Sequence, residues 1–268
     1  MTGQKFDRAE VRAVLDPSAT YIGTGAFGET WRVDGRAMKI IHQDSGVRLQ
    51  REIDGLSRVA HLNVVQLLGQ SRVRLGGEER IVLTFEFIPG LDVEKTITAG
   101  SRLPASKTRE FLIGALAGGR ALHEAGIIHR DLKPANIALR DDDWCQPVLL
   151  DLGLAKILDL SSVTNYPALV GTATYMAPEQ LSGTRIRKAA DVFSLGVVAY
   201  EAVTGVHPFY ASGSVVTVND LLSAIQAGPD DALLAGLDER CRSAILQMLS
   251  PEEHRRGSAQ SLLRQLEG

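Results

Sequence analysis

The polar residues with the most informative spacing lie in the segment 129–136, HRDLKPAN, and at Asp151 in the turn that follows. Asp131 can orient and deprotonate a hydroxyl nucleophile, and Lys133 can neutralise charge that grows on a transferred group. Asn136 and Asp151 carry the hard oxygen ligands that suit magnesium. These are the groups that transfer of a phosphoryl group from a metal-bound nucleotide requires.

Two regions of different secondary structure must position these residues. Residues up to about 85 contain short β-type runs, such as 37–41 and 80–85, and one helical pattern over 47–59. From residue 107 onward, helical patterns dominate. They cover 108–125, 188–204, 218–227, 238–249 and 258–266. The Pro-Gly pair at 89–90 predicts a turn between the two regions, so we expect an α+β fold.

The composition agrees with such a fold and restricts the partners. The 268 residues can bury one large core or two smaller ones, and 44% hydrophobic with 23% charged residues is ordinary for a globular protein. A net charge of −3 gives no electrostatic footprint for nucleic acid or an anionic membrane, so we expect neither as a partner. Cys145 and Cys241 have no disulfide or metal spacing, and no apolar run approaches the roughly 20 residues of a membrane span. We therefore expect a cytoplasmic protein without a membrane segment.

A glycine-rich run, GTGAFG, occupies residues 23–28 between strand-like flanks. Glycines let a backbone approach phosphate oxygens closely, although they also simply make turns. No helix follows at once, as a dinucleotide-binding fold would require. The context therefore favours a phosphate-binding loop on a sheet, with Lys39 on the next strand-like run.

Together, HRDLKPAN, the glycine-rich run, Lys39 and the APE triplet at 177–179 resemble the motifs of eukaryotic-type (Hanks-type) protein kinases. The resemblance covers residues 21–266, and the residue usage suggests a bacterial member. It implies a bilobal protein-kinase-like α+β fold that forms one kinase domain. Residues 1–88 would form a small antiparallel-sheet lobe with one main helix, and residues 89–268 a larger, mostly helical lobe. The nucleotide would bind between the lobes.

The resemblance implies a protein serine/threonine kinase that uses ATP and Mg²⁺, with Mn²⁺ as the alternative metal. Asp131 would be the general base, Lys133 would neutralise charge, and Thr172 would bridge these two side chains. Lys133 and Thr172 favour serine or threonine acceptors over tyrosine. Asn136 and Asp151 would be the metal ligands.

A nucleotide-binding set also follows from the resemblance. It comprises Gly23, Gly25, Phe27, Gly28, Thr30, Ala37, Lys39, Glu52, Glu86, Ile88, Asp92 and Ala138. Thr30 and Ala138 stand where the family commonly has larger apolar residues. We therefore expect a looser hold on the adenine, at a cost of roughly 1–3 kcal/mol in apolar contact.

Two members of this set have alternatives. Lys39 would pair with Glu52 on the following helix, but the linker is shorter than usual, so Asp54 is the alternative partner. Asp92 would meet the ribose hydroxyls, or would instead cap the helix that it precedes.

Four further residues are expected to hold the loops in place. Glu179 would pair with a buried Arg256, and Asp191 would support the backbone of the catalytic loop. The resemblance implies that residues 151–179 form the activation segment, and Arg130 would capture a phosphate on it, ordering it by charge-assisted hydrogen bonds. The acceptor candidates for autophosphorylation there are Thr164, Ser162, Ser161 and Thr174.

Three other functional classes share parts of this pattern. A pseudokinase is disfavoured because the lysine, the carboxylates and the asparagine are all present. A small-molecule kinase of the aminoglycoside or choline type is disfavoured by the Lys133-Pro134 pair and the APE triplet, and a tyrosine kinase by Thr172. The expected partners are a protein substrate with a serine or threonine acceptor and a separate regulator or transient dimer.

Overall fold

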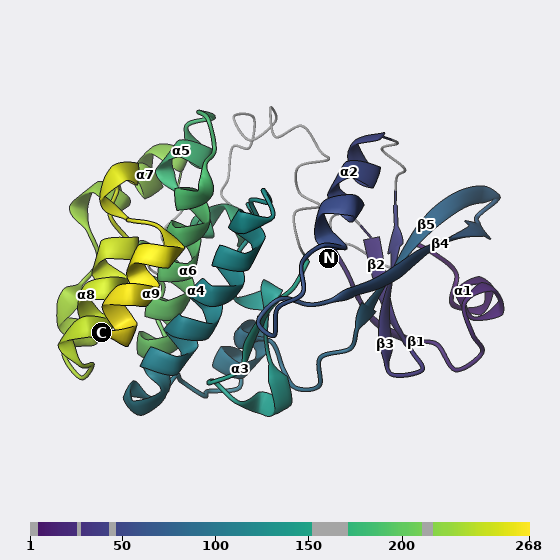
Figure 1. The fold of residues 1–268 in the computed structure, drawn as a ribbon, viewed down its shortest axis with the longest axis horizontal. Helices are drawn as coiled ribbons and strands as arrows, with labels where there is room; N and C mark the ends of the chain where they lie inside the picture. The colour runs from purple at the N-terminus through teal and green to yellow at the C-terminus, as the bar shows by residue number, and fades with distance from the viewer. Residues whose placement is uncertain (1–4, 26–27, 43–46, 152–170, 211–216) are drawn as a thin grey trace. The chain divides into compact units, whose positions relative to one another are not determined.

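A computed structural model of the chain describes residues 5–25, 28–42, 47–151, 171–210 and 217–268. For residues 47, 48, 51, 52 and 172 it describes the backbone only. The chain divides into two compact units (Figure 1). The first contains residues 1–61 and 65–88, and the second contains residues 62–64 and 89–268.

The first unit is built on a five-stranded antiparallel sheet with the strand order β1-β2-β3-β5-β4. The strands are β1 (Thr20–Thr24), β2 (Gly28–Val33), β3 (Arg36–Ile41), β4 (Leu67–Leu75) and β5 (Glu78–Glu86). Two helices complete it, α1 (Arg8–Val14) and α2 (Val47–Leu56).

Tight turns fix the register of two strand pairs in this sheet. Asp34 (φ 49°) and Gly35 (φ 69°) join β2 to β3, and Gly76 (φ 61°) and Gly77 (φ 79°) join β4 to β5. Positive φ at both central residues is the type I′ geometry, whose twist matches that of the flanking strands. The strand that carries Lys39 is therefore held in register from its first residue.

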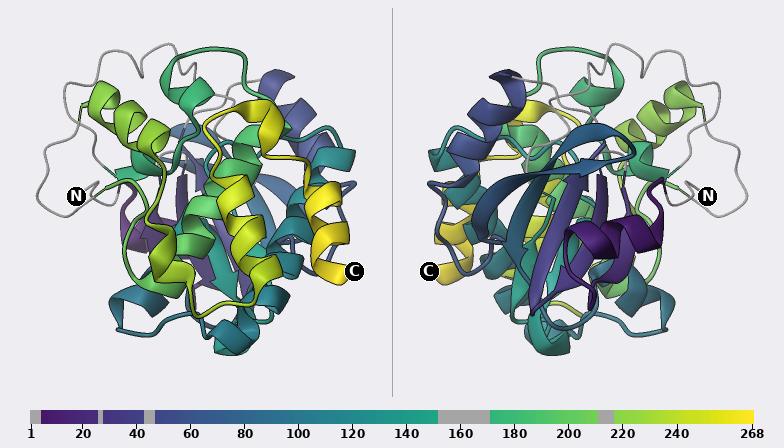
Figure 2. Two further views of the ribbon diagram at one scale, coloured as in Figure 1. Left: turned by 90° about the vertical axis from the view of Figure 1, so that its left-hand side faces the viewer. Right: turned by 90° about the vertical axis from the view of Figure 1, so that its right-hand side faces the viewer.

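An apolar core lies on one side of this sheet and includes α1. Trp31 and Ile40 are fully buried there, together with Val11 of α1 and Phe6 before it. Asp7 begins α1 by accepting hydrogen bonds from the next amides, and the helix packs against β4, as the right-hand view of Figure 2 shows. The sequence analysis does not predict this helix, because its seven residues are mostly polar and only Val11 is buried.

The second unit is mostly helical. Its helices are α3 (Val93–Thr98), α4 (Thr108–Glu124), α5 (Pro178–Leu181), α6 (Lys188–Thr204), α7 (Val218–Ala227), α8 (Glu239–Met248) and α9 (Ala259–Glu267). Short 3₁₀ turns are η1 (Ala105–Lys107), η2 (Pro134–Asn136), η3 (Arg140–Asp142), η6 (Gly171–Tyr175), η7 (Asp231–Leu234) and η8 (Glu253–Arg255). A two-stranded sheet pairs β6 (Ile137–Leu139) with β7 (Pro147–Leu149). Helix α4 packs against α6 and α9 (Figures 1 and 2).

Residues 62–64 belong to the second unit because their polar groups are satisfied there. The Asn63 side chain donates to the carbonyl of Pro147 (2.7 Å), and the Asn63 carbonyl accepts from the amide of Leu149 (2.9 Å). Gly118 of α4 allows this close approach, since a Cβ there would lie 2.6 Å from the Asn63 oxygen. The small sheet is thereby fixed against α4, directly beside Asn136.

The secondary structure follows the sequence patterns closely in the helical region. Helix α6 and helix α7 have the predicted bounds, and α4, α8 and α9 differ from them by one or two residues at an end. Among the described helices, none combines the length and the apolar composition that crossing a bilayer demands.

Candidate active site

The loop that carries Asp131 is tied to the segment before Asp151 by a buried histidine. His129 is fully buried, and its Nε2 donates to the carbonyl of Leu150 (2.7 Å) while its Nδ1 accepts from the amide of Asp131 (3.4 Å). One ring nitrogen donates and the other accepts, so the neutral imidazole satisfies both bonds. His129 therefore connects the two segments rather than facing a reacting group.

Asp191 of α6 holds the backbone of the same loop. Its buried carboxylate accepts from the amides of His129 (2.9 Å) and Arg130 (2.8 Å), and His123 Nε2 lies 2.8 Å away. Arg130 has a φ of 67°, in the left-handed region that costs a non-glycine residue about 1–2 kcal/mol. Charge-assisted hydrogen bonds from Asp191 offset this cost, and they fix the direction in which the chain enters Asp131.

Three side chains converge where Asp131 lies. Its carboxylate Oδ2 is 3.1 Å from Lys133 Nζ and 3.0 Å from Asn136 Nδ2. The Asn136 amide also donates to the Asp131 carbonyl (2.7 Å). The structure thus brings together three of the predicted catalytic and metal residues, with the Asp131 carboxylate about one-fifth exposed.

Asn136 and Asp151, the predicted metal ligands, carry oxygen groups of the kind that a divalent metal ion binds. The two side-chain hydrogen bonds that Asn136 makes to Asp131 both use Nδ2, so its side-chain oxygen faces away from Asp131. The amide of Leu150 donates to the Asn136 backbone carbonyl (2.9 Å), which brings the residue before Asp151 beside Asn136. Asp151 is exposed and has a φ of 54°. One carboxylate and one amide oxygen match Mg²⁺, which takes few protein ligands and completes its shell with phosphate and water.

Among the described residues, no cluster of three or more His, Cys, Asp or Glu side chains could hold a metal ion by itself.

Glu179 and Arg256 form a bidentate ion pair in the second unit. The two Glu179 oxygens lie 2.7 and 2.9 Å from the Arg256 guanidinium, and Arg256 is fully buried. Arg256 also donates to the carbonyls of Ser250 (2.8 Å) and Pro251 (3.0 Å). Removing one partner of a buried ion pair leaves the other charge unpaired and strongly destabilises the fold. This pair therefore anchors the end of the activation segment.

Gln180, which the sequence analysis missed, connects this anchor to the catalytic loop. Its Nε2 donates to the carbonyl of Arg130 (3.0 Å), and its Oε1 accepts from the amide of Ala177 (3.1 Å). Gln180 is buried, and it directly follows the APE triplet. That adjacency was the available signal, but a glutamine on a helix is usually a surface residue.

Two polar contacts fix the segment that precedes the APE triplet. The Tyr175 hydroxyl donates to Glu201 (2.7 Å), and burial raises the pKa of both side chains. His207 Nε2 donates to the carbonyl of Thr174 (3.1 Å), and burial lowers the pKa of His207 to about 4. Neither Glu201 nor His207 was predicted from the sequence, because both lie more than 20 residues from the segment that they hold.

In the first unit, the predicted nucleotide-binding residues Thr30, Ala37 and Lys39 share one face of the sheet. Thr30 lies opposite Lys39 in the β2–β3 pair, and Ala37 lies opposite Phe85 in the β3–β5 pair. Directly opposed residues project to the same face, as do residues two apart on one strand. Lys39 is almost fully buried.

The glycines of the run 23–28 differ in their surroundings. A Cβ at Gly28 would lie 2.3 Å from the carbonyl of Ile40, so pairing of β2 with β3 requires glycine there. A Cβ at Gly23 would meet no atom of the described residues within 4 Å, and one at Gly25 would lie 3.9 Å from the carbonyl oxygen of Gly28. Gly23 and Gly25 thus leave open space beside the backbone, which a phosphate could use.

Asp92 caps a helix in the structure. It is the N-cap of α3, where its carboxylate accepts from the Lys95 amide (2.7 Å) and pairs with Lys95 Nζ (2.6 Å). Ala138 is buried on β6 and bridges to the Asp92 backbone. The capping alternative therefore accounts for the Asp92 carboxylate, and its contact with ribose stays a prediction.

Several predictions fall outside the described residues or on their margin. Phe27, Ser161, Ser162 and Thr164 lie outside them, as do the side chains of Glu52 and Thr172.

Asp54, the alternative partner of Lys39, is exposed and accepts a hydrogen bond from Gln50 (2.9 Å). Thr174 is 8% exposed, which makes it a poor phosphate acceptor in this conformation. Glu86 is half-buried and Ile88 is buried at the end of the first unit.

A five-stranded antiparallel sheet with a lysine on its third strand, and a helical unit that holds an Asp-Lys-Asn loop, define a protein kinase catalytic domain. The chain matches the protein kinase domain family over residues 18–266 and belongs to that family. The predicted family and fold are therefore confirmed.

Bacterial serine/threonine kinases are among its relatives. The chain is 31% identical over 220 residues to the probable serine/threonine-protein kinase PkwA of Thermomonospora curvata, covering 82% of this chain and 28% of that protein. It is 33% identical over 210 residues to the serine/threonine-protein kinase PknA of Mycobacterium tuberculosis, and this match covers 72% of this chain and 48% of that protein. The chain thus spans less than half the length of both relatives.

A solved structure is also similar to this fold. The crystal structure of Rad53 1-466 in complex with AMP-PNP superposes with a TM-score of 0.71 at 26% identity. The match covers 94% of this chain and 63% of that one.

Proposed function

We propose that this chain is an ATP-dependent protein kinase that transfers the γ-phosphoryl group to serine or threonine hydroxyls of proteins. The observation that carries the proposal is the position of the Asp131 carboxylate, 3.1 Å from Lys133 Nζ and 3.0 Å from Asn136 Nδ2. The loop that presents it is fixed by Asp191 and His129. The printed names of the relatives PkwA and PknA support the class of acceptor.

In the proposed reaction, Asp131 accepts the proton of the acceptor hydroxyl as its oxygen bonds to the γ-phosphorus. The bond between that phosphorus and the β-phosphate oxygen breaks, and ADP leaves. Lys133 neutralises charge on the transferred oxygens, and it holds the Asp131 carboxylate toward the acceptor. Thr172 is proposed to complete this alignment through its hydroxyl.

ATP would be held by the face of the first-unit sheet that carries Thr30, Ala37 and Lys39. The open backbone at Gly23 and Gly25 supports a close approach to phosphate oxygens, and Lys39 supplies a cation for them. The remaining proposed contacts are those of Phe27, Gly28, Glu52, Glu86, Ile88, Asp92 and Ala138. AMP-PNP in the Rad53 structure supports an adenine nucleotide as the ligand.

Asn136 and Asp151 would hold Mg²⁺, with Mn²⁺ as the alternative metal. When bound, the metal neutralises charge on the phosphate oxygens. The chain's own part is to aim the Asn136 carbonyl oxygen, which both Nδ2 hydrogen bonds orient away from Asp131.

We also propose autophosphorylation on the activation segment, with Thr164, Ser162 and Ser161 as the acceptors. The buried Nε of Arg130 has no hydrogen-bond partner within the described part of the chain, which supports a phosphate-binding role for this arginine. Regulation by a separate protein or by a transient dimer stays a prediction.

The substrate is proposed to be a protein, and the location to be the cytoplasm. Cys145 and Cys241 are free thiols, which supports a reducing compartment.

Intact-mass spectrometry tests this function. The purified chain is incubated with ATP and magnesium beside Asp131→Asn, and added phosphates are counted by mass. We expect phosphates on the parent chain and none on the variant, with peptide mapping to 152–170. If neither the parent chain nor an added generic protein substrate gained phosphate mass, the result would contradict a functioning kinase.

A further inference from the structure

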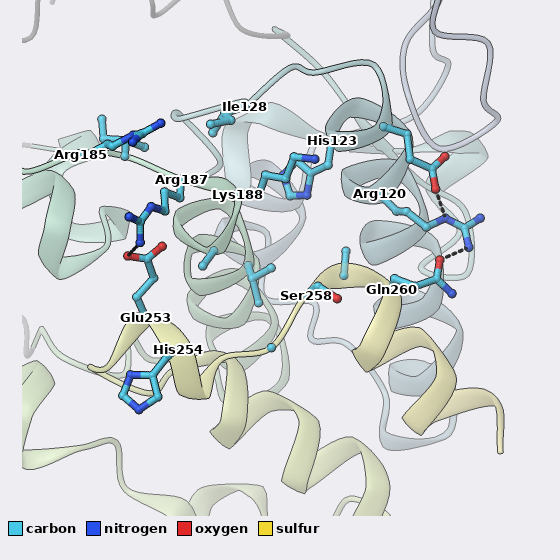
Figure 3. Close-up of a pocket in the computed structure, with 16 residues that line it drawn as sticks. Arg120, His123, Ile128, Arg185, Arg187, Lys188, Glu253, His254, Ser258 and Gln260 are labelled. Carbon is cyan, nitrogen blue, oxygen red and sulfur yellow. Dashed lines mark hydrogen bonds and ion pairs between the residues drawn. The ribbon is translucent and has the colours of Figure 1, made fainter.

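The second unit contains a cavity of about 710 Å³ that the proposed catalysis does not use (Figure 3). Its walls come from the end of α4, the start of α6, the turn η8 and the start of α9. None of the residues that we assign to catalysis, nucleotide binding or metal binding lines it. The volume lies within the roughly 300–1,000 Å³ that ligand sites occupy, and exceeds what a single ion needs.

The rim of this cavity carries an excess of positive charge. Four arginine or lysine side chains line it against two glutamates. Arg187 pairs with Glu253 (3.5 Å), and Arg120 lies 3.7 Å from Glu124. Figure 3 shows the Arg187–Glu253 pair on one wall and the contact of Arg120 with Gln260 on the opposite wall.

Two of the cations are unneutralised. Arg185 and Lys188 are exposed, and neither makes an ion pair or side-chain hydrogen bond to any residue that the structure describes. The whole chain carries a net charge of −3, so this local positive excess runs against its overall charge. Such a patch attracts a negatively charged partner.

Between these cations the lining is apolar. Ile128, Ile186 and Val192 contribute to it, together with the small residues Ala189 and Ala259. Helix α6 begins beside them without a side-chain cap, and its first turn contains the buried carboxylate of Asp191, which offsets part of the positive charge at this end of the helix. A free phosphate would leave the apolar surface uncovered, whereas a peptide with acidic and aliphatic side chains would satisfy both.

We propose that this cavity is a docking site for an acidic segment of a partner protein. Carboxylates of that segment would pair with Arg185 and Lys188, while a neighbouring aliphatic side chain would pack on Ile128, Ile186 and Val192. Burial of the aliphatic group supplies affinity, and the cations select for acidic sequences and speed association. This interaction is independent of ATP binding and of turnover.

The choice of variants follows from the neighbouring contacts. His123 also lines the cavity, but its bond to Asp191 helps to hold the catalytic loop, so it is left unchanged. Arg185 and Lys188 are exposed and make no ion pair or side-chain hydrogen bond within the described part of the chain, so their replacement should leave the fold intact. The matched control reverses the charge of Arg74 and Arg240, which are equally exposed and line no part of the cavity.

The test is fluorescence anisotropy with a labelled hexapeptide of alternating glutamate and leucine, in the absence of nucleotide. We expect saturable binding to the parent chain that Arg185→Glu with Lys188→Glu weakens by at least about tenfold, while Arg74→Glu with Arg240→Glu changes it less than about twofold. A glutamine-leucine hexapeptide should bind at least about tenfold more weakly than the acidic one.

Three results would overturn the proposal. They are no saturable binding of the acidic peptide, equal loss with the control pair, and equal binding of the glutamine peptide. Amide chemical-shift mapping on the parent chain supplies a readout without any substitution. Shifts confined to 120–128, 185–192 and 253–260 would support the site, and shifts elsewhere would refute it.

Discussion

The Asp191 carboxylate lies 2.8 Å from the backbone nitrogen of Arg130, whose φ of 67° places it in the left-handed region. The same carboxylate accepts from the His129 amide and contacts His123. A buried acid on α6 thus sets the backbone that delivers Asp131 to its position. Replacement of Asp191 should therefore perturb the loop 129–136 more than it perturbs the rest of the second unit.

Asp191→Asn should destabilise the chain and slow phosphoryl transfer. The asparagine side chain keeps one accepting oxygen but replaces the other by an NH2 group, which presents hydrogens to a backbone amide that now donates to the carboxylate, at a cost of about 2–4 kcal/mol. Urea denaturation measures the stability, and transfer from labelled ATP measures the activity. Glu267→Gln, at an exposed position of α9, is the control. Stability and activity equal to those of the control would contradict the role of Asp191.

Gln180→Ala should lower the turnover number without lowering affinity for ATP. The change removes the bond to the Arg130 carbonyl and frees the Ala177 amide, while the bonds from Asp191 remain. Since small misplacements of a reacting group are costly, we expect a loss of about ten- to a hundredfold in kcat. Steady-state kinetics separates kcat from KM, and Gln265→Ala on α9 is the control. An unchanged kcat would show that Gln180 does not position the loop.

His207 should make the stability of the chain depend on pH below neutrality. Burial lowers its pKa from 6.5 to about 4, so the folded chain binds this proton less readily than the unfolded chain does. The contribution of neutral His207 is therefore complete above about pH 6.5, and it declines as the pH falls toward 4. At pH 5, the contribution of His207 to the free energy of unfolding should be about 2 kcal/mol smaller than at pH 7.5.

The comparison of His207→Gln with His254→Gln, an exposed histidine, isolates this effect. Between pH 4.5 and pH 7.5, the unfolding temperature should depend less on pH for His207→Gln than for the parent chain. For His254→Gln, it should depend on pH as it does for the parent chain. Identical slopes for the two variants would show that His207 titrates normally.

The two ends of the glycine-rich run should respond differently to alanine. Gly28→Ala places a Cβ 2.3 Å from the Ile40 carbonyl, which forces β2 and β3 apart and should cost about 1–3 kcal/mol. The Cβ of Gly23→Ala would meet no atom of the described residues within 4 Å, so this change should leave the unfolding temperature near that of the parent while raising the KM for ATP. Differential scanning fluorimetry and ATP titration measure the two effects. Equal destabilisation by both changes would contradict this division.

Much of the fold could be predicted from the sequence because its signals are local. The predicted strand-like runs 37–41 and 80–85 lie in β3 and β5, and the helical periodicity of α6 and α7 gives their bounds. Helix α1 was missed because its single buried residue, Val11, produces no periodic pattern. Its helix forms through packing on the sheet, which no short window of sequence reveals.

Local sequence patterns locate the site where neighbours in sequence are neighbours in space, whereas the long-range contacts of Glu179 with Arg256 and of Asp191 with the catalytic loop were predicted from the family resemblance. Asp131, Lys133 and Asn136 lie within six residues, so their convergence is encoded in one loop. The contacts made by Gln180, Glu201 and His207 join segments that lie far apart in sequence, and no local pattern marks them. The capping of α3 by Asp92 was one of two alternatives, and the carboxylate's contacts with Lys95 account for its position.

The most direct test of this account is the rate of phosphoryl transfer from labelled ATP by Asp131→Asn, measured together with ATP affinity. Asn136 and Lys133 remain in this variant, so nucleotide binding should persist within about threefold while kcat falls by at least about a thousandfold. That result would identify Asp131 as the group that accepts the hydroxyl proton. Turnover above about one-tenth of the parent rate would contradict the account, because the chemistry would then not depend on this carboxylate.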